Sequence, residues 1–241
     1  MINQFILMYN ASLVIPIFNE ESNIEYLFEE LKNPEVYNLL QNIVYVDDCS
    51  SDHSLEILEG LAKTNSKIKI IKHKNNLGQS ACILSAAEKL SVTCLVTIDG
   101  DGQNNPKDIP LLLSKYFLDE DLFLVGGIRA VRKDGIIKRI SSRVANKIRK
   151  FILNDDCIDT GCSLKVFDRK LFLGFPFFNG IHRFLPALYK GYGKKTFFID
   201  VDHRPRKYGL SKYGTIDRLF RGVRDMFIVV KILKKHNKTH D

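Results

Sequence analysis

The stretch VTIDGDGQ, residues 96–103, decides how this chain of 241 residues is interpreted. An apolar run of strand length ends here and turns at once into two acidic residues separated by glycine. Other apolar runs of strand length lie at 12–18, 42–48, 68–73 and 122–127. Segments with helical spacing of apolar residues lie between them, at 22–32 and 52–63, and Ser22 with Glu25 predicts a capping box for the first. The alternation predicts an α/β fold with a mainly parallel sheet and right-handed crossovers.

Polar residues follow three of the predicted strands directly. In an open parallel sheet, ligands bind beyond the carboxyl ends of the strands, so these positions are the candidates for chemistry. The first run ends in Pro16, Phe18, Asn19 and Glu20, the second in residues 47–51 and the fourth in residues 99–103. Turn chemistry explains any one of them, because Asp, Ser and Gly are common turn residues. Three acidic ends at one edge favour a binding site.

Asp99 and Asp101 are the candidate metal ligands, because two carboxylates in one turn can bind a hard divalent cation such as Mg²⁺ or Mn²⁺. Gln103 can add a neutral oxygen. A calcium EF-hand is excluded, since its sixth position would be Asn104 rather than glycine and its twelfth Pro110 rather than glutamate. The sequence contains no Walker A motif, no GxGxxG after a strand and no GxSxG elbow. Any nucleotide binding must therefore use strand-end carboxylates and a metal.

The charge of the chain is divided unevenly along its length. Residues 1–128 contain 9 Lys, no Arg and 18 acidic residues, whereas 129–241 contain 27 Lys plus Arg and 10 acidic residues. These halves have formal charges of −9 and +17, which differs from a uniformly basic nucleic-acid coat. An acidic half beside a basic half favours a metal site that faces a phosphate or a membrane surface. We therefore expect no nucleic-acid partner.

Further features of the sequence bear on the compartment. The 5 cysteines are odd in number and form no CxxC pair, so neither a disulfide framework nor a zinc ribbon is indicated, and a reducing cytosol fits best. No run approaches the roughly 20 apolar residues that a membrane span needs. We expect a soluble or peripheral protein and one domain over residues 1–241, because no linker separates the halves.

Several motifs, in their order and spacing, resemble glycosyltransferase family 2 with the GT-A fold. The nearest branch is that of the dolichyl-phosphate mannosyltransferases and polyprenyl-phosphate glycosyltransferases. The motifs are VIPIFNEE (14–21), VYVDDCSSD (44–52), NNLGQSACILSA (75–86), VTIDGDGQNNPKDIP (96–110), GGIRAVR (126–132), DTGCSLKVF (159–167), HRFLPAL (182–188) and HRPRKYGLSKYG (203–214). The resemblance covers nearly the whole chain and implies a mixed, mainly parallel, Rossmann-like sheet flanked by helices. It also implies a nucleotide-sugar and metal half (1–128), an acceptor half with a mobile basic loop (129–214) and a basic amphipathic C-terminal helix (215–241).

The resemblance implies a donor site, position by position. Its nucleotide-sugar residues would be Pro16, Phe18, Glu20, Val46, Asp48, Asp99, Gly100, Asp101, Gln103, Arg183, Arg206 and Lys212. Of these, Asp99, Asp101 and Gln103 would also hold Mg²⁺ or Mn²⁺, and Asp101 would be catalytic. Phe18 stands where the family usually has Tyr, so a hydroxyl contact is lost while stacking can survive. Cys49 replaces the common Gly after the paired aspartates.

The acceptor site implied by the same resemblance is basic. Arg129, Lys138, Arg139 and Ser142 would bind the acceptor phosphate. The expected reaction is an inverting transfer of a sugar from GDP-mannose or a UDP-sugar to a polyprenyl (dolichyl or undecaprenyl) phosphate. Such a phosphate is already ionised near neutral pH, its second pKa being about 6, so cations are needed more than a base. Asp159 is a second catalytic candidate, as a base or a ligand for sugar hydroxyls, and a structural role in its turn is the alternative.

Two other functions stay open from the sequence. One keeps the fold but uses a hydroxyl acceptor in the synthesis of an envelope polysaccharide or glycolipid, with Asp159 as base. The other is a non-catalytic basic adaptor that binds RNA or a membrane.

The C-terminal helix also allows two interpretations. Its apolar face of Phe220, Val223, Phe227, Val230 and Leu233 can pack on the core. Alternatively, the helix lies on an anionic cytoplasmic leaflet, each nearby cation contributing about 1 kcal/mol. A cytoplasmic enzyme, peripheral at the inner membrane face, is expected in the second case, and a separate membrane-protein subunit is another way to anchor it.

Overall fold

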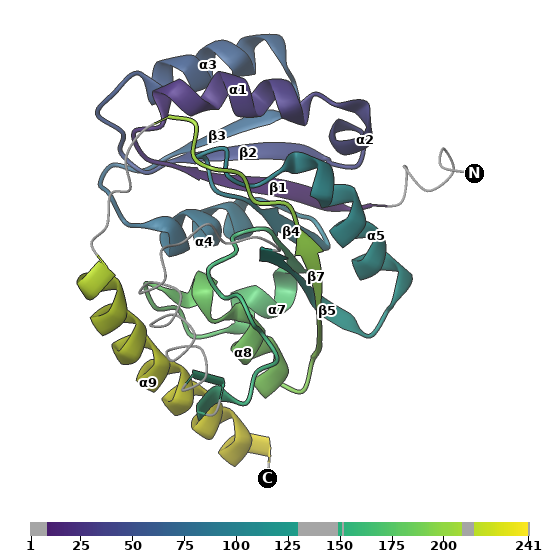
Figure 1. The fold of residues 1–241 in the computed structure, drawn as a ribbon, viewed down its shortest axis with the longest axis vertical. Coiled ribbons are helices and arrows are strands. Elements are labelled where there is room, and N and C mark those ends of the chain that lie inside the picture. The colour runs from purple at the N-terminus through teal and green to yellow at the C-terminus, as the bar shows by residue number, and fades with distance from the viewer. Residues whose placement is uncertain (1–8, 130–148, 151, 209–214, 241) are drawn as a thin grey trace.

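A seven-stranded sheet forms the centre of the molecule (Figure 1). The computed structural model describes residues 9–129, 149–150, 152–208 and 215–240, with side chains described over 222–238 of the last segment. The strand order is β3-β2-β1-β4-β6-β5-β7. The strands are β1 (Ala11–Ile17), β2 (Asn42–Asp47), β3 (Ile68–Lys72), β4 (Cys94–Thr97), β5 (Leu122–Arg129), β6 (Lys165–Asp168) and β7 (Lys195–Val201).

The directions of the strands confirm the mixed, mainly parallel sheet. Strands β3, β2, β1 and β4 are parallel to one another, and β5 is parallel to β7. Strand β6 lies between β4 and β5 and is antiparallel to both. The carboxyl ends of β1, β2 and β4 therefore meet at one edge, and Pro16 lies in register with Val46 across β1 and β2. This edge is where the sequence places the acidic strand ends.

Helices cover both faces of this sheet (Figure 1). One face carries α1 (Glu21–Leu31), α2 (Pro34–Tyr37), α3 (Ser54–Thr64) and α5 (Ile109–Leu118). The other carries α4 (Gln79–Lys89), α7 (Arg169–Gly174), α8 (Leu185–Gly191) and α9 (Thr215–His240). Short 3-10 turns lie at η2 (Pro106–Asp108) and η3 (Ile181–Arg183).

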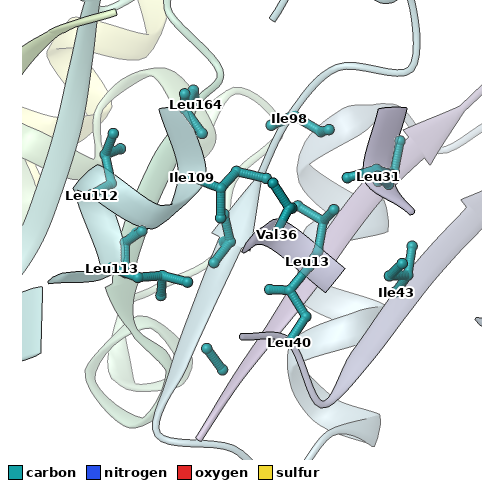
Figure 2. Close-up of a cluster of buried hydrophobic side chains, with 14 of the residues drawn as sticks. Leu13, Leu31, Val36, Leu40, Ile43, Ile98, Ile109, Leu112, Leu113 and Leu164 are labelled. Carbon is teal, nitrogen blue, oxygen red and sulfur yellow. The ribbon is translucent and has the colours of Figure 1, made fainter. Parts of the chain in front are cut away.

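The first of two hydrophobic cores packs helices α1, α2, α3 and α5 against the strands whose carboxyl ends form the acidic edge. Figure 2 shows Leu13 of β1 and Ile43 of β2 packed among Leu31, Ile109 and Leu164. All five side chains are fully buried. Burial of a Leu or Ile side chain contributes roughly 1.5–3 kcal/mol, so this cluster holds the strand ends in fixed positions.

The start of α1 corrects one sequence expectation. No capping box forms, because the helix begins at Glu21 and its N-cap is Glu20 without a side-chain cap. The N–H groups at this end are satisfied from the next loop instead: Ser54 Oγ accepts from the Glu20 N–H (2.9 Å) and Asp52 Oδ2 from the Glu21 N–H (3.2 Å). The start of α1 is thereby fixed to the segment after β2, and Glu20 stays available to the site.

Helix α9 packs on the second core with only part of its apolar face. Val230 and Leu233 pack against this core and Met226 and Val229 are buried in it, whereas Val223 is 43% and Phe227 60% exposed. Of the two interpretations of this helix, packing on the core therefore holds for Val230 and Leu233 and not for Val223 and Phe227. The packed side also contains a carboxylate, because buried Asp225 bonds to Arg183 of η3 at 2.7 Å. Within the residues that the structure describes, no helix is both long enough and apolar enough to cross a membrane.

Candidate active site

Asp99 follows β4 and lies at the centre of the acidic edge. Its Oδ1 accepts a hydrogen bond from Gln79 Nε2 of α4 (2.7 Å), and its N–H donates to Asn104 Oδ1 (3.2 Å). Asn104 Oδ1 also accepts from Ser163 Oγ (2.7 Å), which ties the turn to the start of β6. Burial and the charge of neighbouring Asp101 raise the pKa of Asp99 to about 6. Hydrogen bonds thus hold the carboxylate in place, while burial and the charge of Asp101 disfavour its ionised form.

Arg206 joins two strand ends. Its Nη2 donates to Glu20 Oε1 at 3.2 Å and to Asp101 Oδ2 at 3.1 Å. Asp101 Oδ1 in turn accepts the Gln103 N–H at 3.1 Å. Gly100 lies between the two aspartates, where a Cβ would be 2.5 Å from Ile17 Cδ1 and 3.1 Å from the Pro16 carbonyl oxygen, so glycine lets the turn pack closely on β1. The Arg206 guanidinium, the two aspartates and Glu20 therefore lie in one site.

These residues fit a divalent cation. Asp99 and Asp101 supply hard carboxylate oxygens and Gln103 an amide oxygen, the donors that Mg²⁺ and Mn²⁺ prefer. The raised pKa of Asp99 agrees with this fit, because burial and the nearby charge of Asp101 both disfavour its ionised form, and a bound divalent cation would favour it.

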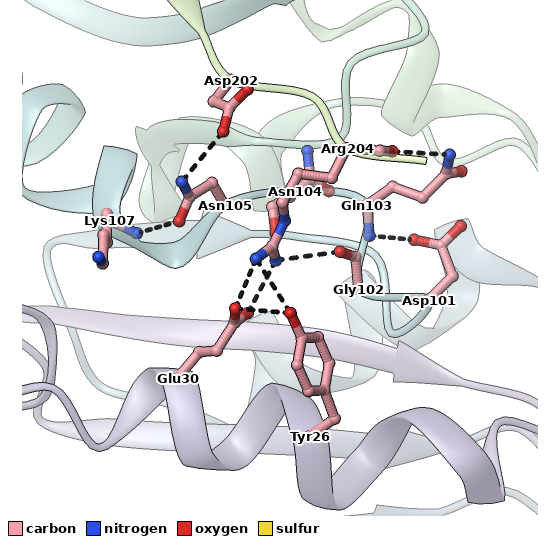
Figure 3. A network of polar contacts seen from close by, with 10 residues as sticks. All are labelled: Tyr26, Glu30, Asp101, Gly102, Gln103, Asn104, Asn105, Lys107, Asp202 and Arg204. Atoms are coloured by element: carbon pink, nitrogen blue, oxygen red, sulfur yellow. Dashed lines mark hydrogen bonds and ion pairs between the residues drawn. The ribbon is translucent and has the colours of Figure 1, made fainter. Parts of the chain in front are cut away.

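A second polar network positions the turn from the other side (Figure 3). Arg204 Nη2 donates to Glu30 Oε2 of α1 (2.7 Å) and to the carbonyls of Gly102 (3.0 Å) and Asn104 (2.9 Å). Arg204 Nη1 completes a bidentate pair with Glu30 and reaches Tyr26 Oη (3.3 Å). The Arg204 N–H also donates to the Gln103 carbonyl (2.9 Å). Arg204 thus fixes the turn at 99–104 to α1, a role that its motif alone does not distinguish from that of Arg206.

Asp48 follows β2 and is buried. Its Oδ1 contacts His73 Nδ1 (2.7 Å) and accepts the Leu77 N–H (2.9 Å), while its Oδ2 accepts the Gly78 N–H (2.7 Å). Both oxygens therefore hold the segment that leads into α4. Val46 is likewise fully buried, and contact of these two residues with a base or ribose stays a prediction.

A cavity of about 670 Å³ opens beside Asp99. Lys165 of β6 and Gln79 contribute to its lining, together with residues from α4, η3 and α9. Its wall includes His182, whose Nδ1 lies 2.6 Å from Ser80 Oγ. Burial lowers the pKa of His182 to about 3, so this imidazole is neutral at physiological pH. The described lining also contains Asn76, Leu77, Gly78, Thr160, Gly161, Cys162, Ser163, Asn179, Gly180, Arg183 and Arg224.

Arg129, at the end of β5, forms a bidentate ion pair with Asp159. Its Nε lies 2.6 Å from Asp159 Oδ2 and its Nη2 2.7 Å from Asp159 Oδ1. The Arg129 N–H donates to the same carboxylate at 3.2 Å, and Asp159 is almost fully buried. The guanidinium is close to the cavity, since a Cβ on Gly161 would lie 2.7 Å from Arg129 Nη2. Asp159 is thus placed to orient the Arg129 guanidinium.

The structure brings most of the expected site residues to one edge. Pro16, Phe18 and Glu20 lie at the end of β1, and Arg183 lines the cavity. Lys138, Arg139, Ser142 and Lys212 lie outside the described residues.

Sequence reasoning missed Gln79, Ser163, Lys165 and Arg224. The strand-end rule, applied to β3 as well, would have drawn attention to the segment that contains Gln79. Ser163 and Lys165 enter through the start of an antiparallel strand, which that rule does not cover.

Comparison with known proteins decides the family. The family model described as "Glycosyl transferase family 2" matches residues 12–174. The chain belongs to glycosyl transferase family 2. It is 33% identical over 228 residues to dodecaprenyl-phosphate galacturonate synthase of Rhizobium johnstonii, covering 92% of this chain and 67% of that protein. It is also 33% identical over 206 residues to undecaprenyl-phosphate 4-deoxy-4-formamido-L-arabinose transferase of Shewanella sediminis, covering 85% of this chain and 62% of that protein.

Solved structures show the same fold in this family 2 chain. Glucosyl-3-phosphoglycerate synthase from Mycobacterium tuberculosis, in complex with Mg²⁺ and UDP, superposes with a TM-score of 0.71 at 18% identity, over 95% of this chain and 82% of that one. Its complex with Mn²⁺, UDP and glucosyl-3-phosphoglycerate gives a TM-score of 0.69 at 19% identity, over 93% and 79%. The expected GT-A fold is confirmed.

Proposed function

We propose that this family 2 protein transfers a sugar from a nucleotide-sugar donor to a polyprenyl phosphate. The observation that carries the proposal is the placement of a carboxylate pair with a cation, Asp99, Asp101 and Arg206, at the same edge as the Arg129–Asp159 pair. A leaving diphosphate needs the first group, and an anionic acceptor needs the second. The two polyprenyl-phosphate enzymes to which the chain is similar support this pairing of substrates.

The donor would lie across the ends of β1, β2 and β4. Arg206 is in position to bond the diphosphate oxygens, because its present partners Glu20 and Asp101 lie at those strand ends. Asp99, Asp101 and Gln103 would hold Mg²⁺ or Mn²⁺. When bound, the cation supplies positive charge that stabilises the leaving diphosphate.

The acceptor phosphate would bind at Arg129. The bidentate contact with buried Asp159 fixes the plane of this guanidinium and so its orientation toward a phosphate. An oxygen of the acceptor phosphate then attacks the anomeric carbon, and the bond from that carbon to the nucleoside diphosphate breaks with inversion. No proton has to be removed from an ionised phosphate, so Asp159 serves as the partner of Arg129 and not as a base.

A transfer assay tests this function directly. Purified protein is incubated with undecaprenyl phosphate, Mg²⁺ or Mn²⁺ and labelled GDP-mannose, UDP-glucose or UDP-galacturonate, and label is measured in the lipid phase. We expect lipid-linked label with at least one donor, and its loss when EDTA removes the cation. Label that appears when undecaprenol, which ends in a hydroxyl, replaces undecaprenyl phosphate, but not with the phosphate itself, would favour the hydroxyl-acceptor alternative.

We also propose that the enzyme works at an anionic membrane surface, through the exposed side of α9. This side consists of Val223, Phe227, Lys231, Lys234 and Lys238, all exposed. Asp225 is the one acidic residue between Gly222 and Lys238, and it is buried. Two exposed apolar side chains beside a row of cations match an anionic lipid surface.

Vesicle sedimentation tests the membrane proposal separately from catalysis. The wild-type chain should sediment with phosphatidylglycerol vesicles and not with phosphatidylcholine vesicles. Phe227→Ala should weaken sedimentation several-fold, because it removes an aromatic side chain from the interface. Leu118→Ala, at an exposed apolar position on α5, is the matched control. Equal sedimentation of both variants and the wild type would contradict the proposal.

A further inference from the structure

Two arginines on the cavity wall share one buried carboxylate. Arg183 Nη2 of η3 lies 2.7 Å from Asp225 Oδ2. Arg224 of α9 donates to Asp225 Oδ1 from Nε (3.2 Å) and Nη2 (3.1 Å). The Asp225 side chain is 0% exposed, whereas the Arg183 side chain is 30% and the Arg224 side chain 66% exposed. Both arginines line the 670 Å³ cavity beside Asp99.

The backbone at Gly180 leaves room for the Asp225 carboxylate. Gly180 has φ +121°, and a Cβ at that position would lie 2.3 Å from Asp225 Oδ2. The Gly180 N–H donates to Ser80 Oγ at 2.9 Å, which fixes the peptide under the carboxylate. Asp225 can therefore approach here only because residue 180 is glycine. The two guanidinium groups are held at the cavity by a close-fitting, buried contact.

The charges around the cavity leave this wall cationic. Arg183 and Arg224 carry two positive charges against the single negative charge of Asp225. Lys165 adds a third cation to the lining, while Asp99 is the one acidic residue among the lining residues that the structure describes. His182 adds no charge, because burial lowers its pKa to about 3. The wall can therefore accept further negative charge.

The chemistry of the pair selects an oxyanion. A guanidinium has five N–H donors in a planar fork that matches phosphate and carboxylate oxygens. Arg224 uses only its Nε and Nη2 atoms on Asp225 in the contacts described. The donor diphosphate is expected at Arg206, which bonds to Glu20 and Asp101, and none of these three residues lines the cavity. A second anionic group is therefore the natural ligand of this wall.

We propose that Arg183 and Arg224, held by Asp225, bind a terminal oxyanion of a substrate, separate from the donor diphosphate. The identity of the ligand rests on the proposed function, which offers two sources of this chemistry. One is the phosphate monoester of the lipid acceptor, which Arg129 beside Gly161 of the same cavity would share with this pair. The other is a carboxylate on the transferred sugar. Asp225 is the positioning residue of the pair in either case.

Binding measurements on Arg224→Gln test the site. Arg224 is suited to substitution because it is largely exposed, and Lys170→Gln, an exposed position on α7, gives the same change of charge away from the cavity. Isothermal titration with Mn²⁺ present uses farnesyl phosphate, UDP-glucuronate and UDP-glucose as probes. The last two differ only by a carboxylate in place of a CH₂OH group. Thermal melts check that Arg224→Gln and a second variant, Arg183→Gln, remain folded.

We expect one anionic probe to bind Arg224→Gln about tenfold more weakly than wild type, because one charge-assisted contact is lost. Binding to Lys170→Gln should be unchanged. A loss confined to farnesyl phosphate assigns the site to the acceptor, and a loss for UDP-glucuronate but not UDP-glucose assigns it to the sugar. Equal loss for both sugar nucleotides overturns the proposal, because the arginines would then bind the diphosphate. Wild-type affinity for every probe also overturns it. If neither sugar nucleotide binds the wild-type protein, the test uses only the affinities of wild type and Arg224→Gln for farnesyl phosphate. The proposed function fails by a different result, the absence of any transfer by the wild-type enzyme.

Discussion

Arg204 and Arg206 follow the same strand, β7, two residues apart, and both pair with carboxylates. Arg204 pairs with both oxygens of Glu30 and with two backbone carbonyls, so all these partners are groups that hold the fold. Arg206 makes one longer bond to each of two strand-end carboxylates, Glu20 and Asp101. The two side chains are about equally exposed. The kind of partner, and not burial, therefore separates a structural arginine from one that can move to a ligand.

Asp101→Asn acts on the Arg206 side of this comparison and should have the largest effect. It removes a proposed metal ligand and a partner of Arg206 with little change in shape. We expect transfer to fall about 1,000-fold, because charge stabilisation of the leaving group is lost. The rate of lipid labelling at saturating donor and Mn²⁺ measures this loss.

Glu30→Gln is the matched control for Asp101→Asn, because it removes the carboxylate partner of Arg204 by the same chemical change. It should leave the rate per folded molecule within about threefold, the loss falling on stability. An equal loss of rate in the two variants would erase the distinction between the two arginines.

Arg206→Gln tests the arginine itself. We expect about a 100-fold fall in kcat, since one cation that stabilises the departing diphosphate is gone. The free energy of unfolding should change by less than about 1 kcal/mol, because the contacts of Arg206 with Glu20 and Asp101 are single ion pairs of a partly exposed side chain, and such pairs contribute little. Steady-state kinetics and urea denaturation on the same preparation give both quantities. A large loss of stability with normal kcat would place Arg206 with Arg204 as a structural residue.

Arg204→Gln should give the opposite pattern. It leaves Glu30 without its bidentate partner and the carbonyls of Gly102 and Asn104 without a donor. We expect a loss of about 2 kcal/mol in unfolding free energy, which corresponds to roughly 4–8 °C in Tm for a chain of this size. Differential scanning calorimetry measures it. An unchanged Tm together with lost activity would contradict the structural role.

The sequence predicted the part of the site that lies at parallel strand ends. Asp99, Asp101 and Glu20 follow such strands directly, so a local rule finds them. Lys165 begins antiparallel β6 and Ser163 lies just before it, and no local pattern indicates which strand is antiparallel. Arg204 and Arg206 belong to one motif and differ only in partners that are at least 100 residues away.

Helix α9 shows the same limit of local patterns. Apolar spacing groups Val223 and Phe227 with Val230 and Leu233, but the first two are exposed while the last two pack on the core. The helix also buries Asp225 in an ion pair with Arg183, which apolar spacing does not predict. Long-range pairing of this kind depends on which segments the fold brings together, and that information lies outside any short window of sequence.

The pH dependence of stability gives the smallest and most selective test. Burial alone would raise the pKa of Glu30, but hydrogen bonds from Arg204 and Tyr26 lower it below its ordinary value of 4.5. The Arg204–Glu30 pair therefore stabilises the fold fully above about pH 4.5, and this contribution is lost as the pH falls through the lowered pKa. We expect wild type to exceed Glu30→Gln by about 1 kcal/mol at pH 7 and by progressively less below pH 4.5, as measured by urea unfolding at each pH. Because other titrating groups are common to both proteins, their effects cancel in the difference. A gap that stays constant down to pH 3 would show that the charge of Glu30 does not contribute, and that Arg204 acts through its carbonyl contacts alone.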